Sequence, residues 1–499
     1  MTRALANQRS GVIGGAAPKA VTPARGSEKA APPLATQAAP DEDFADTTPA
    51  AYPVWPVLFV TTMCLPFIFW FGTFRMSPYR VILLIAFIPA IITWLSGRVG
   101  KPTMVDLCFL AASIWATTAL FINGNFSEVY QTSGILLIET FGSYLLGRVY
   151  VTNYEQFLRF TKYLWGVLLV LLPFAMYETL AHQNLILSNL KYIGNTFPPI
   201  DIGARMGLYR AHVIFEHPIL WGVFASSLFG VLTYTLGKSV LSRSVTGLMA
   251  TAATISSVSS GALVSLAVQM IIMAWDKFTI RIKRRWRLLG GIAIGLYVLV
   301  DMISTRTPFQ VFITYLTFSS QSSYNRVNIW TFGTAEVWRH PIFGIGLGDW
   351  ERPSYMSASM DNFWLATAVR YGLPTLIMFS YGIIRLMYLM GRSNLTDPGV
   401  IRARTGLMAT YIGIIFSGCT VHYWNSMYCW VLFLFGIGHW MIKPPAHAVA
   451  KQEEPAVPEK SAQSVRQVIV TPRPRPVTAQ PPKAPASTPN ATPEKRWLK

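Results

Sequence analysis

Twelve apolar runs follow one another along the middle of this chain, and they restrict it to very few folds. Only 13% of its 499 residues are charged and 52% are hydrophobic, whereas soluble domains average about 25% charged residues. Most of the runs are long enough to cross a bilayer as a helix. The sequence therefore predicts an all-α polytopic membrane protein with about 12 transmembrane helices.

The predicted membrane domain covers residues 54–442. Its apolar runs lie near 54–72, 79–97, 104–122, 132–150, 160–181, 213–236, 244–257, 260–275, 288–303, 362–390, 405–421 and 424–442. Only a serine-rich stretch at 256–260 separates the seventh run from the eighth. One long re-entrant unit at this place, and a total of ten or eleven spans, is the alternative.

The two ends of the chain have a different composition. Residues 1–53 are rich in Ala, Pro and Thr, and residues 443–499 are rich in Pro, Ala, Lys and Arg. Such segments bury too little apolar surface to fold, so both are predicted to be disordered. The acidic triplet Asp41-Glu42-Asp43 is interpreted as solvated charge and not as a metal-binding motif. The tail is expected to be solvated, or else to bind a partner domain or anionic lipids.

The formal charge of +19 follows the positive-inside rule, by which Lys and Arg gather in cytoplasmic loops. With a cytoplasmic N-terminus, the densest basic cluster, 277–287, lies inside, whereas the outer loops 123–131 and 421–425 contain no Lys or Arg. This assignment makes both termini cytoplasmic and excludes a nucleic-acid-binding role. Arg75 and Arg80, in the first outer loop, depart from the rule.

Two longer outer loops also carry basic residues. The loop 182–212 contains Lys191, Arg205 and Arg210, and the loop 304–361 contains Arg306, Arg326, Arg339 and Arg352. Because arginines bind anionic groups bidentately and stay charged, an anionic ligand would explain their presence on the translocated side. The alternative is local ion pairing with Asp201, Glu336, Asp349 and Glu351.

Ionisable residues within the apolar runs are concentrated at their outer ends. Those in the outer halves are Glu139, Glu178, Glu216, His217, Asp301 and Arg370. Charges in a membrane are costly and usually face a cavity or a partner. Their one-sided distribution predicts a polar cavity beneath the two long outer loops, with a single helix-to-helix contact as the alternative for each residue.

Two motifs lie in these loops. The first reads Arg210-Ala211-His212, then Glu216-His217-Pro218, and ends at Gly222. The second begins Asn325-Arg326 and Trp330 and continues to Arg339-His340-Pro341, Gly344 and Gly346. Together, over about residues 50 to 445, they resemble the O-antigen ligase/polymerase superfamily of bacterial surface-polysaccharide assembly, which includes the Wzy-type polymerases.

This chain departs from the family pattern in two places. Ligases of the family commonly close the large loop with His-Asn, where this chain has Asp361-Asn362. Many members have Ser-Arg-Gly where this chain has Ser259-Ser260-Gly261. Both departures favour a divergent polymerase over a ligase.

The resemblance implies a glycosyltransferase of the bacterial inner membrane. It would polymerise undecaprenyl-pyrophosphate-linked oligosaccharide repeat units into exopolysaccharide or O-antigen at the periplasmic face, without a metal or another cofactor. Its expected partners are the lipid-linked donor, a glycan acceptor, membrane lipids and a chain-length-regulating co-polymerase. The alternatives are an O-antigen ligase and, from a different class, a 12-helix secondary transporter or flippase.

The resemblance and the chemistry assign roles to particular residues. Arg210 and Arg326 are expected to hold the pyrophosphate leaving group, and Asp361 is expected to act as the base, unless it merely caps the helix that follows. The predicted substrate-binding residues are Arg205, Glu216, His217, Arg339, His340, Trp330 and Arg370. For His340 a structural role in the loop turn, and for Trp330 anchoring of the loop, are the alternatives.

Overall fold

The computed structural model describes residues 52–200, 203–315 and 320–442, and it is mostly helical, as predicted. Seven described helices are long and apolar enough to cross a membrane. They are α2 (Pro78–Leu95), α3 (Met104–Asn123), α6 (Tyr154–Ala181), α8 (Pro218–Thr235), α10 (Ser260–Phe278), α11 (Arg285–Ile303) and α15 (Leu373–Arg392). The arm and tail predicted to be disordered lie outside the described residues, apart from Tyr52 and Pro53.

Shorter elements connect and complete these helices. They are α1 (Val54–Met63), β1 (Phe69–Phe71), β2 (Phe74–Met76), α4 (Phe126–Leu137), the π-helix η2 (Ile138–Gly142), α5 (Ser143–Tyr150), α7 (Leu185–Leu190), α9 (Val240–Ser256), α12 (Pro308–Tyr315), α13 (Ser320–Arg339), α14 (Phe363–Tyr371), α16 (Pro398–Gly418), α17 (Asn425–Ile437) and the 3-10 helix η3 (His439–Met441). The two strands pair as an antiparallel hairpin.

Each of the twelve apolar runs contains a helix, but the number of membrane crossings stays a prediction, and three boundaries were wrong. The first helix ends at Met63, before Pro66, because proline cannot continue a helix, and the hairpin follows. The sixth run becomes helical only at Pro218, which suits the first helical position. The tenth run is divided at Gly372, whose φ of 85° is left-handed.

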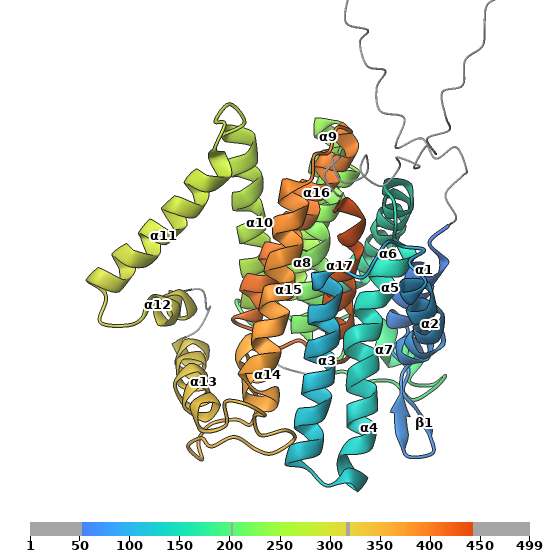
Figure 1. Cartoon of the computed structure of the whole chain (residues 1–499), viewed down its shortest axis with the longest axis vertical. Coiled ribbons are helices and arrows are strands. Elements are labelled where there is room, and N and C mark those ends of the chain that lie inside the picture. The colour runs from blue at the N-terminus through green and yellow to red at the C-terminus, as the bar shows by residue number, and fades with distance from the viewer. Residues whose placement is uncertain (1–51, 201–202, 316–319, 443–499) are drawn as a thin grey trace, which may run out of the picture. The chain divides into compact units, whose positions relative to one another are not determined.

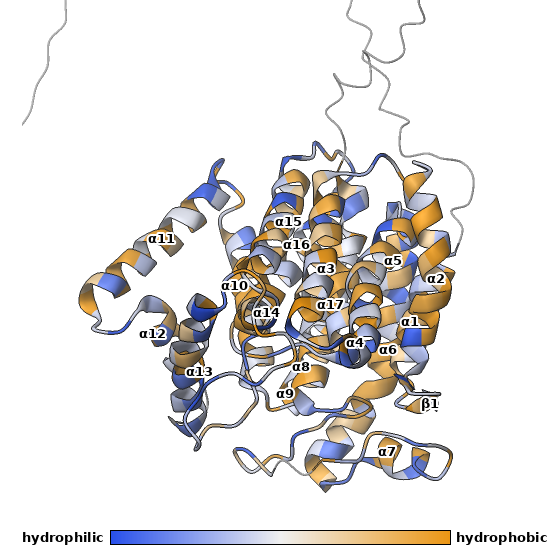
Figure 2. Cartoon of the chain, turned by 60° about the horizontal axis from the view of Figure 1, so that its bottom comes forward, coloured by the Kyte–Doolittle hydropathy of each residue, from blue (hydrophilic) through white to orange (hydrophobic). Residues whose placement is uncertain are grey.

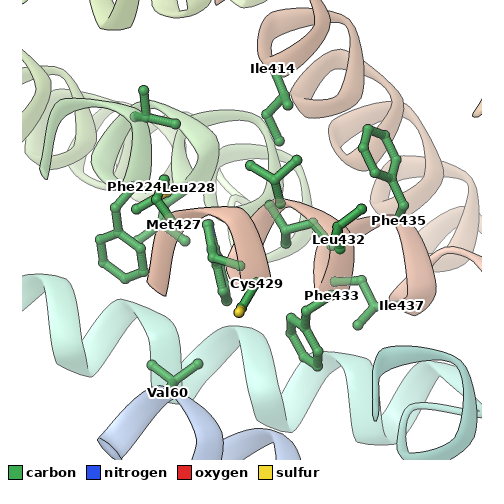
Figure 3. Packing of buried hydrophobic residues seen from close by; sticks show 14 of the residues in the cluster. Val60, Phe224, Leu228, Ile414, Met427, Cys429, Leu432, Phe433, Phe435 and Ile437 are labelled. Carbon is green, nitrogen blue, oxygen red and sulfur yellow. The ribbon is translucent and has the colours of Figure 1, made fainter. Parts of the chain in front are cut away.

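The helix α17 lies at the centre of the core. Its buried side chains include Met427, Cys429 and Phe433, and Figure 3 shows them among side chains from α1, α8 and α16. A helix that is apolar on all sides lies in a protein core or in a membrane, and the buried side chains of α17 place it in the core. The irregular loop just before α17 contacts the start of α14, since the amide of Phe363 donates to the carbonyl of Val421 at 3.0 Å.

Apolar side chains also cover outward-facing surfaces. Figure 2 shows largely hydrophobic residues along α2 and α11, and more hydrophilic ones along α13. The helix α11 stands apart from the other helices in Figure 1, and none of its side chains is buried. Exposed apolar helices of this length are what a surrounding bilayer requires.

The long polar segment 304–361 is folded. Side chains of α13 and the following loop, among them Ile329, Val337 and Trp350, pack against Leu365 and Val369 of α14 in a small core of their own. Figure 1 places α13 and α14 towards the same end of the helices as the β1–β2 hairpin. The segment is thus held in one position relative to α14.

The turn 340–348 completes the C-terminal end of α14. The amides of Ile345 and Gly346 donate to the carbonyls of Val369 and Arg370, both at 2.9 Å. These carbonyls are among those that a helix leaves without intrahelical partners at its C-terminus. The His-Pro-Gly motif therefore builds a backbone contact between the loop and the membrane domain.

We expect Gly372→Ala to destabilise the protein by at least about 2 kcal/mol, through backbone strain and steric overlap. The residue has a left-handed φ, and an added Cβ would overlap the carbonyl oxygen of Ile342. Thermal unfolding of the detergent-solubilised protein measures the effect. The control is Gly166→Ala within α6, where a Cβ meets no atom within 4 Å; a similar loss in both variants would contradict this account.

Candidate functional site

The starts of three helices meet beneath the loop segment. Arg210 and His217 precede α8, Asp361 precedes α14, and Ser260 is the first residue of α10. The two loops are connected to these helix ends: Nη2 of Arg326 donates to Oγ of Ser260 at 3.2 Å. Because a helix N-terminus carries partial positive charge, this junction favours an anion.

Three arginines and one carboxylate lie within electrostatic reach of one another here; we call them the arginine cluster (Arg205, Arg210, Arg326 and Asp361). Burial, and secondly the charge of Arg205, lower the pKa of Arg210 to about 10, and Asp361 opposes the shift. Burial also lowers the pKa of Arg326. The charge of Asp361 opposes this shift, and the charge of Arg205 adds to it. The structure thus brings together all three predicted catalytic residues and Arg205.

Arg210 is the buried arginine of this cluster. It is 4% exposed, and no hydrogen-bond partner for its Nε lies in the described part of the chain. Among the described residues, Asp361 is the carboxylate whose charge opposes the lowered pKa of Arg210 and of Arg326, and Asp201 lies outside those residues. A buried guanidinium that lacks an acceptor is costly, so the arrangement is suited to an anion bound from outside.

Asp361 does not cap α14. Oδ1 of the neighbouring Asn362 accepts the hydrogen bond from the amide of Leu365, at 3.0 Å, and so fills the cap position. Oδ1 of Asp361 instead accepts from Oγ of Ser359 at 3.0 Å. The capping interpretation of Asp361 was therefore wrong, and its carboxylate remains available for other chemistry.

His217 is placed as a neutral hydrogen-bond donor. Its Nδ1 accepts from the amide of Ile219 at 3.0 Å and caps α8, so the proton of the neutral ring is on Nε2. Burial, and then the charges of Arg210, His212 and Arg205, lower the pKa of His217 to about 4. With Nδ1 occupied, this histidine is poorly suited to be the base.

Acidification from pH 6.5 to pH 4 is expected to destabilise the protein through His217. The unfolded chain binds this proton near pH 6.5 and the folded chain only near pH 4, so the free energy of unfolding falls as the pH falls. His422, whose burial also lowers its pKa to about 4, acts in the same direction. Each histidine contributes at most about 1.4 kcal/mol per pH unit.

Thermal midpoints of the solubilised protein at pH 7 and pH 5 measure this dependence. His217→Asn is expected to reduce the difference between the two midpoints, because an asparagine oxygen can cap α8 without titrating. An unchanged difference in the variant would show that His217 does not contribute.

Glu216 belongs to a second polar network. Its Oε2 accepts from Nδ2 of Asn425 at 2.7 Å and from Nε1 of Trp424 at 3.0 Å, and its Oε1 lies 3.4 Å from Arg75. Such a fully engaged carboxylate joins the segment before α8 to the loop before α17. Its role in the structure is to anchor that loop.

A neighbouring ion pair belongs to the same network. Nε of Arg80 lies 2.7 Å from Glu139, within the π-helix η2, and Nη2 of Arg80 donates to Asn425 at 3.3 Å. These contacts account for the arginines that departed from the positive-inside rule, since Arg75 and Arg80 each pair with a carboxylate.

The remaining loop residues stabilise the loop. Arg339 pairs with Glu336 at 3.1 Å and also with Glu351. Nε2 of His340 lies 3.6 Å from Glu336, and the ring of Trp330 packs against Phe309 with centroids 4.1 Å apart. The structure places these three predicted substrate-binding residues in local contacts and not in the arginine cluster.

Two further ionisable residues of the apolar runs lie elsewhere. Glu178 accepts the backbone amides of His212 and Val213, at 3.1 and 2.9 Å, and so shapes the segment that carries Arg210. Asp301 is exposed on α11. A polar cavity was predicted from the ionisable residues of the apolar runs, but not all of these residues line it.

Two adjoining cavities open beside the cluster. They have volumes of about 250 and 240 Å³ and share Ala366, Arg370, His422 and Trp424. Ser359 and Met360, which directly precede Asp361, line the first cavity, and the ring of Trp424 lies 5.6 Å from that of His217. The cavities therefore lie beside the arginine cluster, close to Asp361 and His217.

Sequence reasoning missed several of the residues that build this site. Ser260, His422, Trp424 and Asn425 were not predicted, although the loop 421–425 stood out as an outer loop without Lys or Arg. In the described ranges, no group of three or more His, Cys, Asp or Glu side chains could hold a metal ion.

Comparison with known proteins adds no assignment. No family model matches the chain, and a search of characterised proteins finds no match. The resemblance to the ligase/polymerase superfamily therefore rests on the two loop motifs and on their positions among the apolar runs.

Proposed function

We propose that this protein is a membrane glycosyltransferase that polymerises undecaprenyl-pyrophosphate-linked oligosaccharide repeat units. The observation that carries the proposal is the arginine cluster, in which the guanidinium of Arg210 is buried and its Nε has no hydrogen-bond partner among the described residues. A pyrophosphate would supply acceptors for this group, and arginine forks match phosphate oxygens well.

The chemistry is a single displacement at a sugar carbon. A hydroxyl oxygen of the acceptor glycan forms a bond to the anomeric carbon of the donor, and the bond from that carbon to the pyrophosphate oxygen breaks. Asp361 takes the proton of the hydroxyl, and undecaprenyl pyrophosphate leaves with the electron pair. Arg210 and Arg326 stabilise the charge that develops on the leaving group.

The proposed setting is the bacterial inner membrane. Twelve spans with cytoplasmic termini put the segments 182–212 and 304–361 in the periplasm, where the lipid-linked donor is presented. The seven long apolar helices and the exposed apolar surface of α11 support a membrane location. The ion pairs of Glu139 and Glu216 with arginines stabilise the side of the site that is next to the β-hairpin.

A deletion strain tests the proposal by the length of its glycan. A polymerase predicts that single repeat units accumulate on the lipid carrier, and that the full-length gene restores long chains. Long lipid-linked chains that are not transferred would identify a ligase instead. Unchanged surface polysaccharide would exclude both activities.

A further inference from the structure

The two adjoining cavities are lined by a positively charged side chain, Arg370, to which the proposed chemistry gives no role. We define the Arg370 cavity as both of them, joined at Ala366, Arg370, His422 and Trp424. With volumes of about 250 and 240 Å³, the two together fall within the size range of small-molecule sites, roughly 300–1,000 Å³. The side chains that line the two cavities indicate which ligand they would bind.

Arg370 is the charged group of this cavity with no carboxylate partner. Its Nη1 donates to the carbonyl of Gly346 at 3.3 Å, and among the described residues it forms no ion pair. Glu139 also lines the cavity, but its charge is matched by Arg80 at 2.7 Å. Arg370 is thus the cationic side chain that both cavities share. The nearby Asp349, whose pKa is lowered by its hydrogen bond with Arg352 and also by the charge of Arg370, is itself paired with Arg352.

The other walls combine aromatic rings with neutral polar groups. Trp350 and Trp424 line the first cavity, and Tyr371 and Tyr428 line the second. Nδ1 of His422 is buried and has no hydrogen-bond partner in the described part of the chain. Burial, and then the charge of Arg370, lower the pKa of this histidine to about 4, which keeps it neutral.

Aromatic faces, neutral polar groups and one guanidinium are the features that recognise a sugar bearing a single negative charge. The rings cover its apolar faces, the polar groups bond its hydroxyls, and the guanidinium pairs with a carboxylate. A phosphate carries up to two charges, which one enclosed arginine balances poorly. The arginine cluster is better suited to that ligand.

We propose that the Arg370 cavity binds a carboxylate-bearing sugar, of the uronic acid type, in the glycan on which this protein acts. The inference rests on the proposed function, and it specifies the substrate as an acidic glycan. It assigns Arg370 to the recognition of the carboxylate, Trp350 and Trp424 to the sugar faces, and His422 to a hydroxyl. Asp361, the member of the arginine cluster that directly follows the cavity-lining residues Ser359 and Met360, is then next to the bound sugar.

Binding to the full-length protein in detergent tests this without turnover. Saturation-transfer NMR with glucuronic acid and glucose as separate probes, together with phosphorus NMR line broadening for inorganic pyrophosphate, is expected to show glucuronic acid bound about tenfold more tightly than glucose. One charge-assisted hydrogen bond accounts for a difference of that size. Equal binding of the two sugars, or no binding of either, would overturn the proposal.

Three variants locate the site. Arg370→Gln is expected to remove the preference for glucuronic acid and to leave glucose binding, whereas Ala366→Leu, which fills both cavities, is expected to remove both. Arg306→Gln, which changes an exposed arginine of the same loop outside the cavity lining, is the control and keeps the preference. A preference that persists in correctly folded Arg370→Gln, or in Ala366→Leu, would place the site elsewhere.

Competition separates the possible ligands and the two proposals. If pyrophosphate displaces glucuronic acid from the wild type and itself no longer binds to Arg370→Gln, the cavity is a phosphate site and the inference is wrong. A sugar preference together with normal chain length in the deletion strain would refute the proposed function alone. Shortened chains without a sugar preference would refute this inference alone.

Discussion

Replacing Arg210 with glutamine is expected to reduce the polymerisation rate by about 100- to 1,000-fold, the usual effect of removing one donor that stabilises developing negative charge. Thermal stability is expected to be unchanged or increased. Arg210 is buried beside Arg205, and its Nε has no acceptor among the described residues, so its charge is a cost to the free protein. Stability given up at a functional site is the expected signature of a binding group.

The measurement combines glycan length on gels with protein level and the thermal midpoint. Arg326→Gln is expected to show the same loss of long chains, because Arg326 shares the cluster. Arg306→Gln is the matched control, since this loop arginine is exposed and lies outside the arginine cluster. Full-length polysaccharide from Arg210→Gln or Arg326→Gln cells with normal protein levels would refute the leaving-group role.

Asp361→Asn is expected to lower the rate by about 100- to 10,000-fold, as the loss of a general base does. The substitution keeps the size of the side chain and a hydrogen-bond acceptor for Ser359. It does not disturb the cap of α14, which is Asn362. The structure therefore separates the chemical role from a structural one at this position.

The companion substitution is Asn362→Asp, at the cap itself. Aspartate caps a helix as well as asparagine does, so its effect on stability is expected to be small. Asn362→Ala is expected to cost about 1 kcal/mol of stability and to retain more activity than Asp361→Asn. If Asp361→Asn keeps full activity, Asp361 is not the base.

The helical architecture could be predicted well because it depends on local patterns. Runs of apolar residues predict helices from one segment at a time, and the two loop motifs made Arg210 and Arg326 candidates, as the loop-closing Asp361-Asn362 did Asp361. The helix boundaries were less accurate. Pro66, Pro218 and Gly372 are visible in the sequence, but because the residues around them are apolar, the predicted runs continued across these positions.

Ion pairing could not be predicted in the same way. Arg75 and Glu216 are far apart in sequence, as are Arg80 and Glu139, and only the fold brings them within 3.4 and 2.7 Å. The sequence could not distinguish an arginine paired in this manner from Arg210, whose Nε has no hydrogen-bond partner among the described residues. That distinction decides which arginines are suited to a ligand.

By itself, then, the sequence determined the helices, the polar loops between them and a short list of chemically suitable residues, because hydropathy and motifs are local properties. Only the tertiary structure decided that Arg205, Arg210 and Arg326 meet around Asp361, that Asn362 caps α14, and that Arg370 faces a cavity. The physical reason is that charge balance and enclosure depend on distances between segments remote in sequence, which packing alone sets.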